Sequence, residues 1–204
     1  MFDNLREDYR MHEGTITSQG LWVMVPYRFG RWRYKVKWRI FRLPLSFIYR
    51  VMKTLSQILT GIDLPCEVTV GRRFRIDHFG DIIISGDTVM GDDVLIRNGV
   101  TIGLRKREEP GAPILGNRVD VGAGAKILGK IRIGDDVVIG ANAVVIRDVP
   151  SRSIAVGIPA RVVARKDMGT RKDMAPVSSR DESREEAFHN QTEKEDPSQC
   201  EAAR

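Results

Sequence analysis

The fold of this chain is decided by residues 84–102, which read ISGDTVMGDDVLIRNGVTI, and by the same pattern continued to residue 150. An aliphatic residue opens each group of six, and the fifth residue of each group is small or branched. On an extended backbone, residues two apart point to the same side, so the fifth position and the next first position both face inward. The first positions are Ile84, Met90, Ile96, Ile102, Leu115, Val121, Ile127, Ile133, Ile139 and Val145.

Turn-forming pairs lie between the first and fifth positions, for example Gly86-Asp87, Asp92-Asp93 and Asn98-Gly99. A short strand and a corner in every group of six describe parallel strands wound into a triangular prism, with three groups in each coil. An ordinary β-sandwich is the alternative, but its strands recur every 8 to 12 residues or so and would not hold a six-residue frame. The sequence therefore predicts a mainly β fold, a parallel β-helix of hexapeptide repeats.

The six-residue frame is interrupted twice. The step from Ile76 to Ile84 takes eight residues, which predicts a two-residue bulge just after His78. The step from Ile102 to Leu115 takes thirteen residues. The excess must leave the prism as a loop, because its charged side chains cannot enter an apolar core. Irregularities in a rigid repeat are places where function is added, so both interruptions are candidate functional regions.

The chain has 204 residues, of which 42% are hydrophobic, and this length and content are enough for one main domain with appendages. Its net charge is +6. Cys66 and Cys200 are its two cysteines, so we expect no disulfide framework and a reducing compartment. The first thirty residues lack the pattern of a secretory signal, and no run of about eighteen uncharged apolar residues occurs. These features predict a cytoplasmic protein without a membrane span.

Three regions are predicted. Residues 1–62 form a basic, aromatic and mostly helical N-terminal segment, whose first helix stops near Gly14. Residues 63–163 form the β-helix, in which the regular strands end after residue 150 because Gly157 and Pro159 break any strand there. Residues 164–204 hold few large apolar side chains and cannot offset their ordering entropy, so we expect a disordered C-terminal tail.

The N-terminal segment has an unusual charge pattern. From Gly14 to Ile62 there is no Asp or Glu, while nine Lys and Arg residues alternate with aromatic residues. In one interpretation the segment is a helical cap whose aromatic residues cover the first coil while its arginines face water. In the other, residues 28–53 make a peripheral contact with the inner face of an anionic membrane. No motif that reads nucleic-acid bases is present, so a nucleic-acid partner is not expected.

The histidines limit the possible chemistry. The chain has three, and only His78 lies in the prism, whereas His12 and His189 lie outside it. A zinc enzyme on this fold needs several imidazoles that converge on one ion. We therefore predict no metal.

His78 lies in the sequence RIDHFGD (75–81), at the corner that the eight-residue step distorts. It is either a surface histidine or a general base. Neutral imidazole accepts protons well near neutral pH, and a carboxylate on its other nitrogen fixes the tautomer and stabilises the imidazolium. Asp63, Asp77 and Asp81 are the nearby carboxylates.

Three blocks resemble the serine acetyltransferases of the left-handed β-helix acyltransferase superfamily. They are residues 76–103 (IDHFGDIIISGDTVMGDDVLIRNGVTIG), 116–150 (GNRVDVGAGAKILGKIRIGDDVVIGANAVVIRDVP) and 155–163 (AVGIPARVV). The resemblance covers roughly residues 62–163. It implies a left-handed prism, a homotrimer with active sites between neighbouring prisms, and acetyl-CoA as the donor. The sequence leaves open whether two trimers pair into a dimer of trimers.

The resemblance also assigns catalytic roles. It places the general base on His78 and the carboxylate that orients this base on Asp63, fifteen residues earlier. Asp77 matches the carboxylate that holds the amino group of serine. Transfer would be direct, since neither cysteine lies at a matching position.

For acetyl-CoA, the resemblance implies a groove of small residues followed by cations. Gly103 would lie near the thioester, and small side chains would let the pantetheine arm approach the backbone closely. The matching positions are Gly103, Ala123 and Ala141 for the groove, and Arg147 and Arg161 for the CoA phosphates.

One departure from the family leaves the acceptor open. Serine acetyltransferases carry an Arg-His-Pro run in the long loop, which holds the substrate carboxylate, whereas this chain has Gly111-Ala112-Pro113. Arg105, Lys106 and Arg107 are the cations that the loop offers instead. The acceptor is L-serine or a sugar hydroxyl of cell-surface polysaccharide biosynthesis. A non-catalytic scaffold or membrane-docking module is the alternative from another class, and the retained catalytic positions argue against it.

Overall fold

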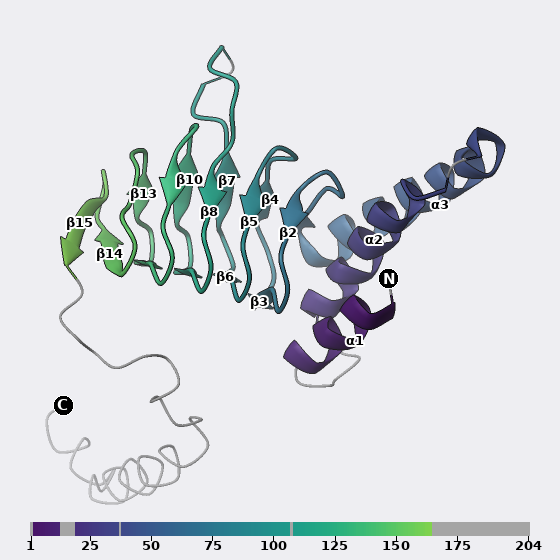
Figure 1. The fold of residues 1–204 in the computed structure, drawn as a ribbon, viewed down its shortest axis with the longest axis horizontal. Coiled ribbons are helices and arrows are strands. Elements are labelled where there is room, and N and C mark those ends of the chain that lie inside the picture. The colour runs from purple at the N-terminus through teal and green to yellow at the C-terminus, as the bar shows by residue number, and fades with distance from the viewer. Residues whose placement is uncertain (1, 13–18, 37, 107, 165–204) are drawn as a thin grey trace, which may run out of the picture. The chain divides into compact units, whose positions relative to one another are not determined.

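The computed structural model describes residues 2–12, 19–36, 38–106 and 108–164, in which three helices precede a coil of short strands (Figure 1). The helices are α1 (Phe2–Met11), α2 (Gln19–Arg33) and α3 (Arg39–Thr60). The strands are β1 (Ile62–Asp63), β2 (Thr69–Val70), β3 (Arg75–Asp77), β4 (Ile82–Ile84), β5 (Val89–Met90), β6 (Leu95–Arg97), β7 (Thr101–Gly103), β8 (Ile114–Leu115), β9 (Asp120–Val121), β10 (Lys126–Leu128), β11 (Arg132–Ile133), β12 (Val138–Ile139), β13 (Val144–Val145), β14 (Ser153–Val156) and β15 (Arg161–Ala164).

The helices and strands belong to one compact unit, Met1–Arg165. The second unit, Lys166–Arg204, lies outside the described residues, as does Gly14. The predicted helix stop at Gly14, the disordered tail and the division into three regions therefore stay predictions.

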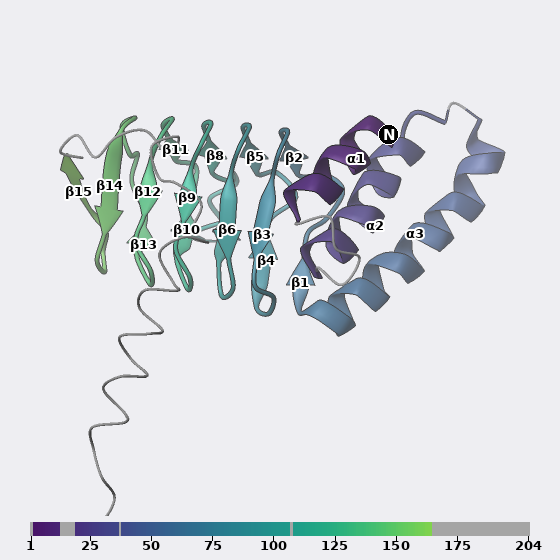
Figure 2. The ribbon, with the colours of Figure 1, turned by 90° about the horizontal axis from the view of Figure 1, so that it is seen from below.

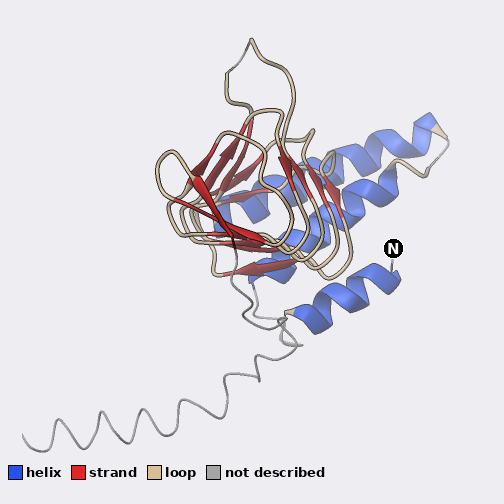
Figure 3. Cartoon of the chain, turned by 60° about the vertical axis from the view of Figure 1, so that its left-hand side comes forward, coloured by secondary structure: helices blue, strands red, loops and turns tan. Residues whose placement is uncertain are grey.

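The strands form three sheets, which enclose the core of a parallel β-solenoid (Figure 3). Sheet A has the order β1-β4-β7-β10-β13, sheet B the order β11-β8-β5-β2, and sheet C the order β15-β14-β12-β9-β6-β3. Figure 2 shows the strands of sheet C side by side. The predicted β-helix is confirmed, and its left-handed winding stays an expectation from the resemblance.

The register confirms the predicted inward positions, because the first residues of successive coils are partners and are all buried. Sheet A pairs Ile84 with Ile102, Ile102 with Ile127, and Ile127 with Val145. Sheet B pairs Val70, Met90, Leu115 and Ile133 in the same way, and sheet C pairs Ile76, Ile96, Val121, Ile139 and Ala155. Each buried aliphatic side chain stabilises the fold by about 1.5–3 kcal/mol relative to exposure, so the aligned columns form a continuous core.

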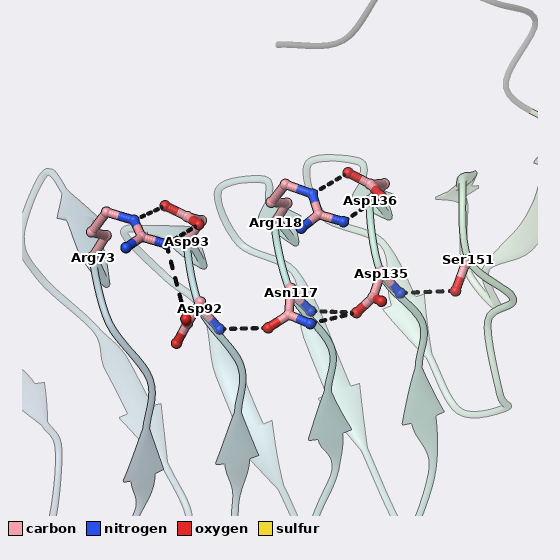
Figure 4. Close-up of polar contacts among 8 residues, drawn as sticks. All are labelled: Arg73, Asp92, Asp93, Asn117, Arg118, Asp135, Asp136 and Ser151. Atoms are coloured by element: carbon pink, nitrogen blue, oxygen red, sulfur yellow. Dashed lines mark hydrogen bonds and ion pairs between the residues drawn. The ribbon is translucent and has the colours of Figure 1, made fainter. Parts of the chain in front are cut away.

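The corner between sheets B and C carries a ladder of side chain to backbone hydrogen bonds (Figure 4). The Asp92 backbone N–H donates to Asn117 Oδ1 at 2.9 Å, and the Asn117 N–H donates to Asp135 Oδ1 at 2.6 Å. The Asp135 N–H donates to Ser151 Oγ at 3.0 Å. A Cβ atom at Gly116 would lie 2.4 Å from Asp135 Oδ1, so glycine is required before the asparagine. The ladder satisfies backbone donors that the turning strands leave without partners.

The helices cap the first coil through two buried tyrosines. The Tyr27 hydroxyl donates to the Val68 carbonyl at 2.8 Å, and the Tyr49 hydroxyl accepts from the Cys66 N–H at 3.1 Å. This confirms that aromatic residues of the N-terminal segment cover the first coil.

The expectation that the arginines of the cap face water is wrong for Arg28 and Arg33, which are buried. Arg28 forms an ion pair with Asp8 of α1 at 2.9 Å. A carboxylate twenty residues away in the sequence makes this burial possible, because a buried charge needs a partner.

The C-terminal part of the prism also differs from expectation. Gly157, at φ +97°, and Pro159 do lie in a turn, but strands flank it on both sides. β14 continues sheet C in parallel beside β12, and β15 folds back antiparallel on β14. The prism therefore does not end after residue 150, because the turn residues reverse the chain without interrupting the sheet.

The ladder of Figure 4 predicts that Asp135→Ala lowers the free energy of unfolding by about 1–2 kcal/mol, since Asn117 loses the acceptor of its backbone N–H. Urea denaturation measures this. Asp87→Ala, at an exposed corner position with no hydrogen bond to a described residue, is the matched control and should change stability little. Equal losses for the two variants would contradict the account.

Candidate active site

The corner between β3 and β4 is the distorted one that the eight-residue step predicts. Four residues, 78–81, connect the strands. His78 has φ +63° and Asp81 has φ +54°, and Gly80 is also left-handed at φ +103°. The equivalent corners of later coils turn with a single left-handed residue, such as Gly99 or Gly124. A histidine held in this sparsely populated region signals local strain of the kind that clusters at functional sites.

The backbone on both sides holds this corner in place. The Gly99 N–H of the next coil donates to the Gly80 carbonyl at 3.0 Å, and the Ile82 N–H donates to the Gly61 carbonyl at 3.2 Å. Gly61, at φ +67°, is the left-handed cap of α3, and a Cβ there would lie 3.3 Å from the Asp81 nitrogen. The exposed imidazole of His78 is thus presented from a fixed backbone.

Asp63 lies in β1, where its Cα partner is Ile83 of the strand that follows the corner. Its Oδ1 atom is 3.0 Å from Lys53 Nζ of α3, yet this buried oxygen receives no hydrogen bond of good geometry. His78 makes no side-chain hydrogen bond to a described residue. The structure of the single chain therefore contains a Lys53–Asp63 ion pair in place of the expected Asp63–His78 hydrogen bond. A buried oxygen without a donor is an available acceptor.

Asp77 directly precedes His78 and is the last residue of β3. The Arg75 guanidinium donates to Asp77 Oδ1 at 2.5 Å. No hydrogen bond from a described residue reaches the other carboxylate oxygen, Oδ2. Asp77 can therefore still accept from a substrate ammonium group through this oxygen.

Two of the predicted groove residues lie on the same column of corners as His78. The Gly124 N–H donates to the Asn98 carbonyl at 2.9 Å, and the Asn142 N–H donates to the Ala123 carbonyl at 2.8 Å. Ala123 and Ala141 thus occupy corners of successive coils, aligned along the solenoid with the corner of His78. Their small side chains leave the backbone open to a ligand.

Two other predicted cofactor residues, Gly103 and Arg147, lie at or after the opposite, C-terminal ends of sheet A strands, whereas Arg161 belongs to sheet C. Gly103 ends β7 where the long loop leaves the solenoid, and its carbonyl accepts from the Gly129 N–H at 2.8 Å. The predicted loop is confirmed and is the projection seen above β7 and β8 in Figure 1. Arg147 follows β13, and Arg161 begins β15. Both arginines are exposed, and neither pairs with a carboxylate of the described residues.

Apart from Arg161, the predicted cofactor residues thus lie at the two ends of the sheet A strands. Between these strand ends, the outward-facing residues of sheet A pair from strand to strand, in the order Asp63, Ile83, Thr101 and Lys126. Small residues along one corner column, and arginines without carboxylate partners at the last coil, suit the pantetheine arm and the phosphates of CoA. The residues present therefore fit acetyl-CoA.

Other groups supply no competing chemistry in the described part of the chain. Cys66 is buried, and burial raises the pKa of its thiol, so it is a packing residue and not a nucleophile. No cluster of three or more His, Cys, Asp or Glu side chains able to hold a metal occurs in the ranges that the structure describes. Cys200 lies outside them.

The chain matches known proteins over this region, although no protein-family model matches it. It is 44% identical over 133 residues to the serine acetyltransferase of Helicobacter pylori, covering 65% of this chain and 78% of that protein. It is 38% identical over 185 residues to the serine acetyltransferase of Synechococcus elongatus, covering 85% and 72%. The solved structure of soybean serine acetyltransferase complexed with serine matches with a TM-score of 0.66 at 27% identity, covering 79% of this chain and 68% of that chain.

The solenoid of six-residue steps and the serine acetyltransferase relatives place the chain among the hexapeptide-repeat acyltransferases. Within this class, the chain belongs to the serine acetyltransferase family. It is a CoA-dependent O-acetyltransferase, as the resemblance implied. The individual roles of His78, Asp63, Asp77 and the cofactor residues stay predictions.

If Arg147 and Arg161 bind the CoA phosphates, their replacement should weaken binding of acetyl-CoA but not of a donor without these phosphates. The variant Arg147→Gln/Arg161→Gln should raise KM for acetyl-CoA about ten-fold or more, because charge-assisted bonds to phosphates are lost. It should leave KM for acetyl-pantetheine unchanged, since this donor lacks the nucleotide phosphates. Arg72→Gln, an exposed arginine near the other end of the solenoid, is the control. Equal KM changes for both donors would contradict the assignment.

Proposed function

We propose that the chain is a serine O-acetyltransferase that transfers acetyl from acetyl-CoA directly to the hydroxyl of L-serine. The observation that carries the proposal is its membership of the serine acetyltransferase family. The strained corner that presents His78 directly after Asp77 supports it. The soybean relative was solved with serine bound, which supports the same acceptor here.

In the proposed mechanism, His78 removes the proton of the serine hydroxyl while the hydroxyl oxygen forms a bond to the thioester carbon. The C–S bond then breaks, and the CoA thiolate takes the proton that His78 holds. Asp63 orients the imidazole through its available carboxylate oxygen and stabilises the imidazolium. A backbone N–H near Gly103 meets the transient oxyanion. No covalent acetyl-enzyme forms, in agreement with a buried and protonated Cys66.

The long loop must supply a cation for the serine carboxylate. Gly111-Ala112-Pro113 carries none, and Ala112 and Pro113 are buried. Lys106 is engaged by Glu109 at 3.2 Å. Arg105 is exposed and has no ion pair with a described residue, so we assign the carboxylate to Arg105. Arg107 lies outside the described residues.

The same departure favours the second candidate, a sugar O-acetyltransferase of cell-surface polysaccharide biosynthesis. A sugar acceptor has no carboxylate that would require the missing Arg-His pair. The specific observation that favours the sugar acceptor is that the loop carries Gly111-Ala112-Pro113 in place of this pair.

We further propose a homotrimer, with the active site completed by a neighbouring prism, that works in the cytoplasm without nucleic acid. Trimers can also pair into a dimer of trimers. The outward face of sheet A, flanked by the predicted residues, is a surface that a neighbouring prism can cover. The peripheral membrane contact expected of residues 28–53 is a separate proposal, because it concerns where the enzyme works and not what it transfers.

The acceptor is tested by measuring CoA release with L-serine and with a panel of glycans, and by identifying the acetylated product by mass spectrometry. We expect release with serine and formation of O-acetylserine. Release with a glycan but not with serine would overturn the proposal in favour of the sugar acceptor. Absence of both CoA release and CoA binding would indicate a non-catalytic scaffold.

The assignment of Arg105 has a matched control in its neighbour. Arg105→Gln should raise KM for serine about ten-fold, because a charge-assisted hydrogen bond to the carboxylate is lost, with a smaller effect on kcat. Lys106→Gln, whose lysine is already paired with Glu109, should change KM little. A larger rise in KM for serine with Lys106→Gln than with Arg105→Gln would assign the serine carboxylate to Lys106 instead.

The variant His78→Ala should lower kcat at least about 100-fold, as expected when a general base is removed. Calorimetry should still show CoA binding, and light scattering should give an unchanged oligomeric mass. Turnover close to that of the unaltered protein would exclude His78 as the base.

A further inference from the structure

Helix α3 exposes an apolar face along its whole length. Nine large hydrophobic side chains on it are between 44% and 76% exposed. They are Ile40, Phe41, Leu43, Phe47, Ile48, Val51, Leu55, Ile58 and Leu59, which we call the α3 outer face. At 3.6 residues per turn, all nine positions fall on one side of the helix, although some of them are neighbours in the sequence. Contiguous exposed apolar patches of this extent mark interaction sites.

The opposite side of α3 makes the contacts that hold it to the molecule. Tyr49 is buried against the first coil, Lys53 pairs with Asp63, and the Ser56 hydroxyl donates to the Trp22 carbonyl of α2 at 3.4 Å. In Figure 2, α2 lies between α1 and α3, with α3 on the outside. The α3 outer face is therefore the side of the helix that nothing in the chain's described part covers.

The charges around this face indicate what covers it. The segment from residue 15 to residue 62 holds no Asp or Glu and nine Lys and Arg residues, of which Arg28 and Arg33 are buried and Lys53 pairs with Asp63. Arg50 is exposed on α3, and Arg31 and Lys35 are exposed at the end of α2 and just beyond it. A second copy docked face to face would bring cations against cations without a carboxylate from this segment. Anionic lipid headgroups would neutralise the same cations.

The composition of the face also suits a lipid surface. Trp38, directly before α3, is 72% exposed, and Phe41 and Phe47 follow on the helix. Aromatic side chains are favoured where hydrocarbon meets headgroups. No helix of the described residues has the length and apolar content to cross a bilayer. A helix with a long apolar face and flanking cations instead lies in the plane of the interface.

We propose that the α3 outer face docks the protein on an anionic lipid bilayer, with α3 lying parallel to the surface. This surface, from Trp38 to Leu59, differs from the residues 28–53 predicted from the sequence. Arg28 and Arg33 are buried and cannot meet lipid, whereas the apolar stripe continues beyond residue 53. The proposal does not depend on which acceptor the enzyme uses.

The test is flotation of the full-length protein with vesicles of phosphatidylcholine alone and with phosphatidylglycerol added. We expect binding to the anionic vesicles, weak binding to neutral ones, and loss of binding as salt is raised. The variant Phe47→Ser/Ile58→Ser should lower the partition coefficient about ten-fold or more, because two apolar side chains no longer insert. Arg50→Gln should weaken binding to anionic vesicles and leave binding to neutral vesicles unchanged.

Ile158→Ser is the matched control, since Ile158 is 75% exposed and Ile58 is 74% exposed, but Ile158 lies in the hairpin between β14 and β15. It should float like the unaltered protein. Failure of the unaltered protein to bind anionic vesicles would overturn the proposal, and so would equal flotation of the double variant. A drop in the solution mass of the double variant, together with absent vesicle binding, would show that a second copy covers the face.

Discussion

The register between successive coils is the constraint on which the rest of the structure depends. Ile84, Ile102 and Ile127 are partners in one column, so each coil must return its backbone to the same place one strand further along. Extra residues cannot be absorbed by the strands, because a slip of one residue would turn aliphatic side chains out of the core. They must leave at a corner. The two additional residues after Ile76 and the seven after Ile102 do so, and they build the strained corner of His78 and the projecting loop.

This constraint explains why so much of the fold is predictable from the sequence. Periodic burial needs only local spacing, and the aliphatic columns and both interruptions follow from it. The buried ion pair of Arg28 with Asp8 does not, because it joins two helices by a contact that no period encodes. The hairpin of β14 and β15 does not follow from the sequence for a related reason. Gly157 and Pro159 signal a turn, but the strands on either side are fixed by pairing with β12, which is distant in the sequence.

In the candidate site, too, features set by the repeat are predictable from the sequence and contacts between distant segments are not. The strained position of His78 and the alignment of Ala123 and Ala141 along the corners follow from the repeat. The contact between Lys53 and Asp63 was not predictable, because it depends on how the end of α3 packs against β1. A cation ten residues before an aspartate carries no signal by itself. This contact joins the helical segment to the proposed catalytic carboxylate, but it leaves Asp63 Oδ1 without a hydrogen bond of good geometry, and His78 has no partner among the described residues.

The central claim is that His78 acts as a base that Asp63 orients. The most direct test is the distance between the His78 imidazole and the Asp63 carboxylate in a crystal structure of the assembled enzyme with CoA and serine. The account predicts a hydrogen bond, with heavy atoms about 2.6–3.2 Å apart. An Asp63 that stays paired with Lys53 alone, beside a His78 that contacts neither Asp63 nor the serine hydroxyl, would contradict it.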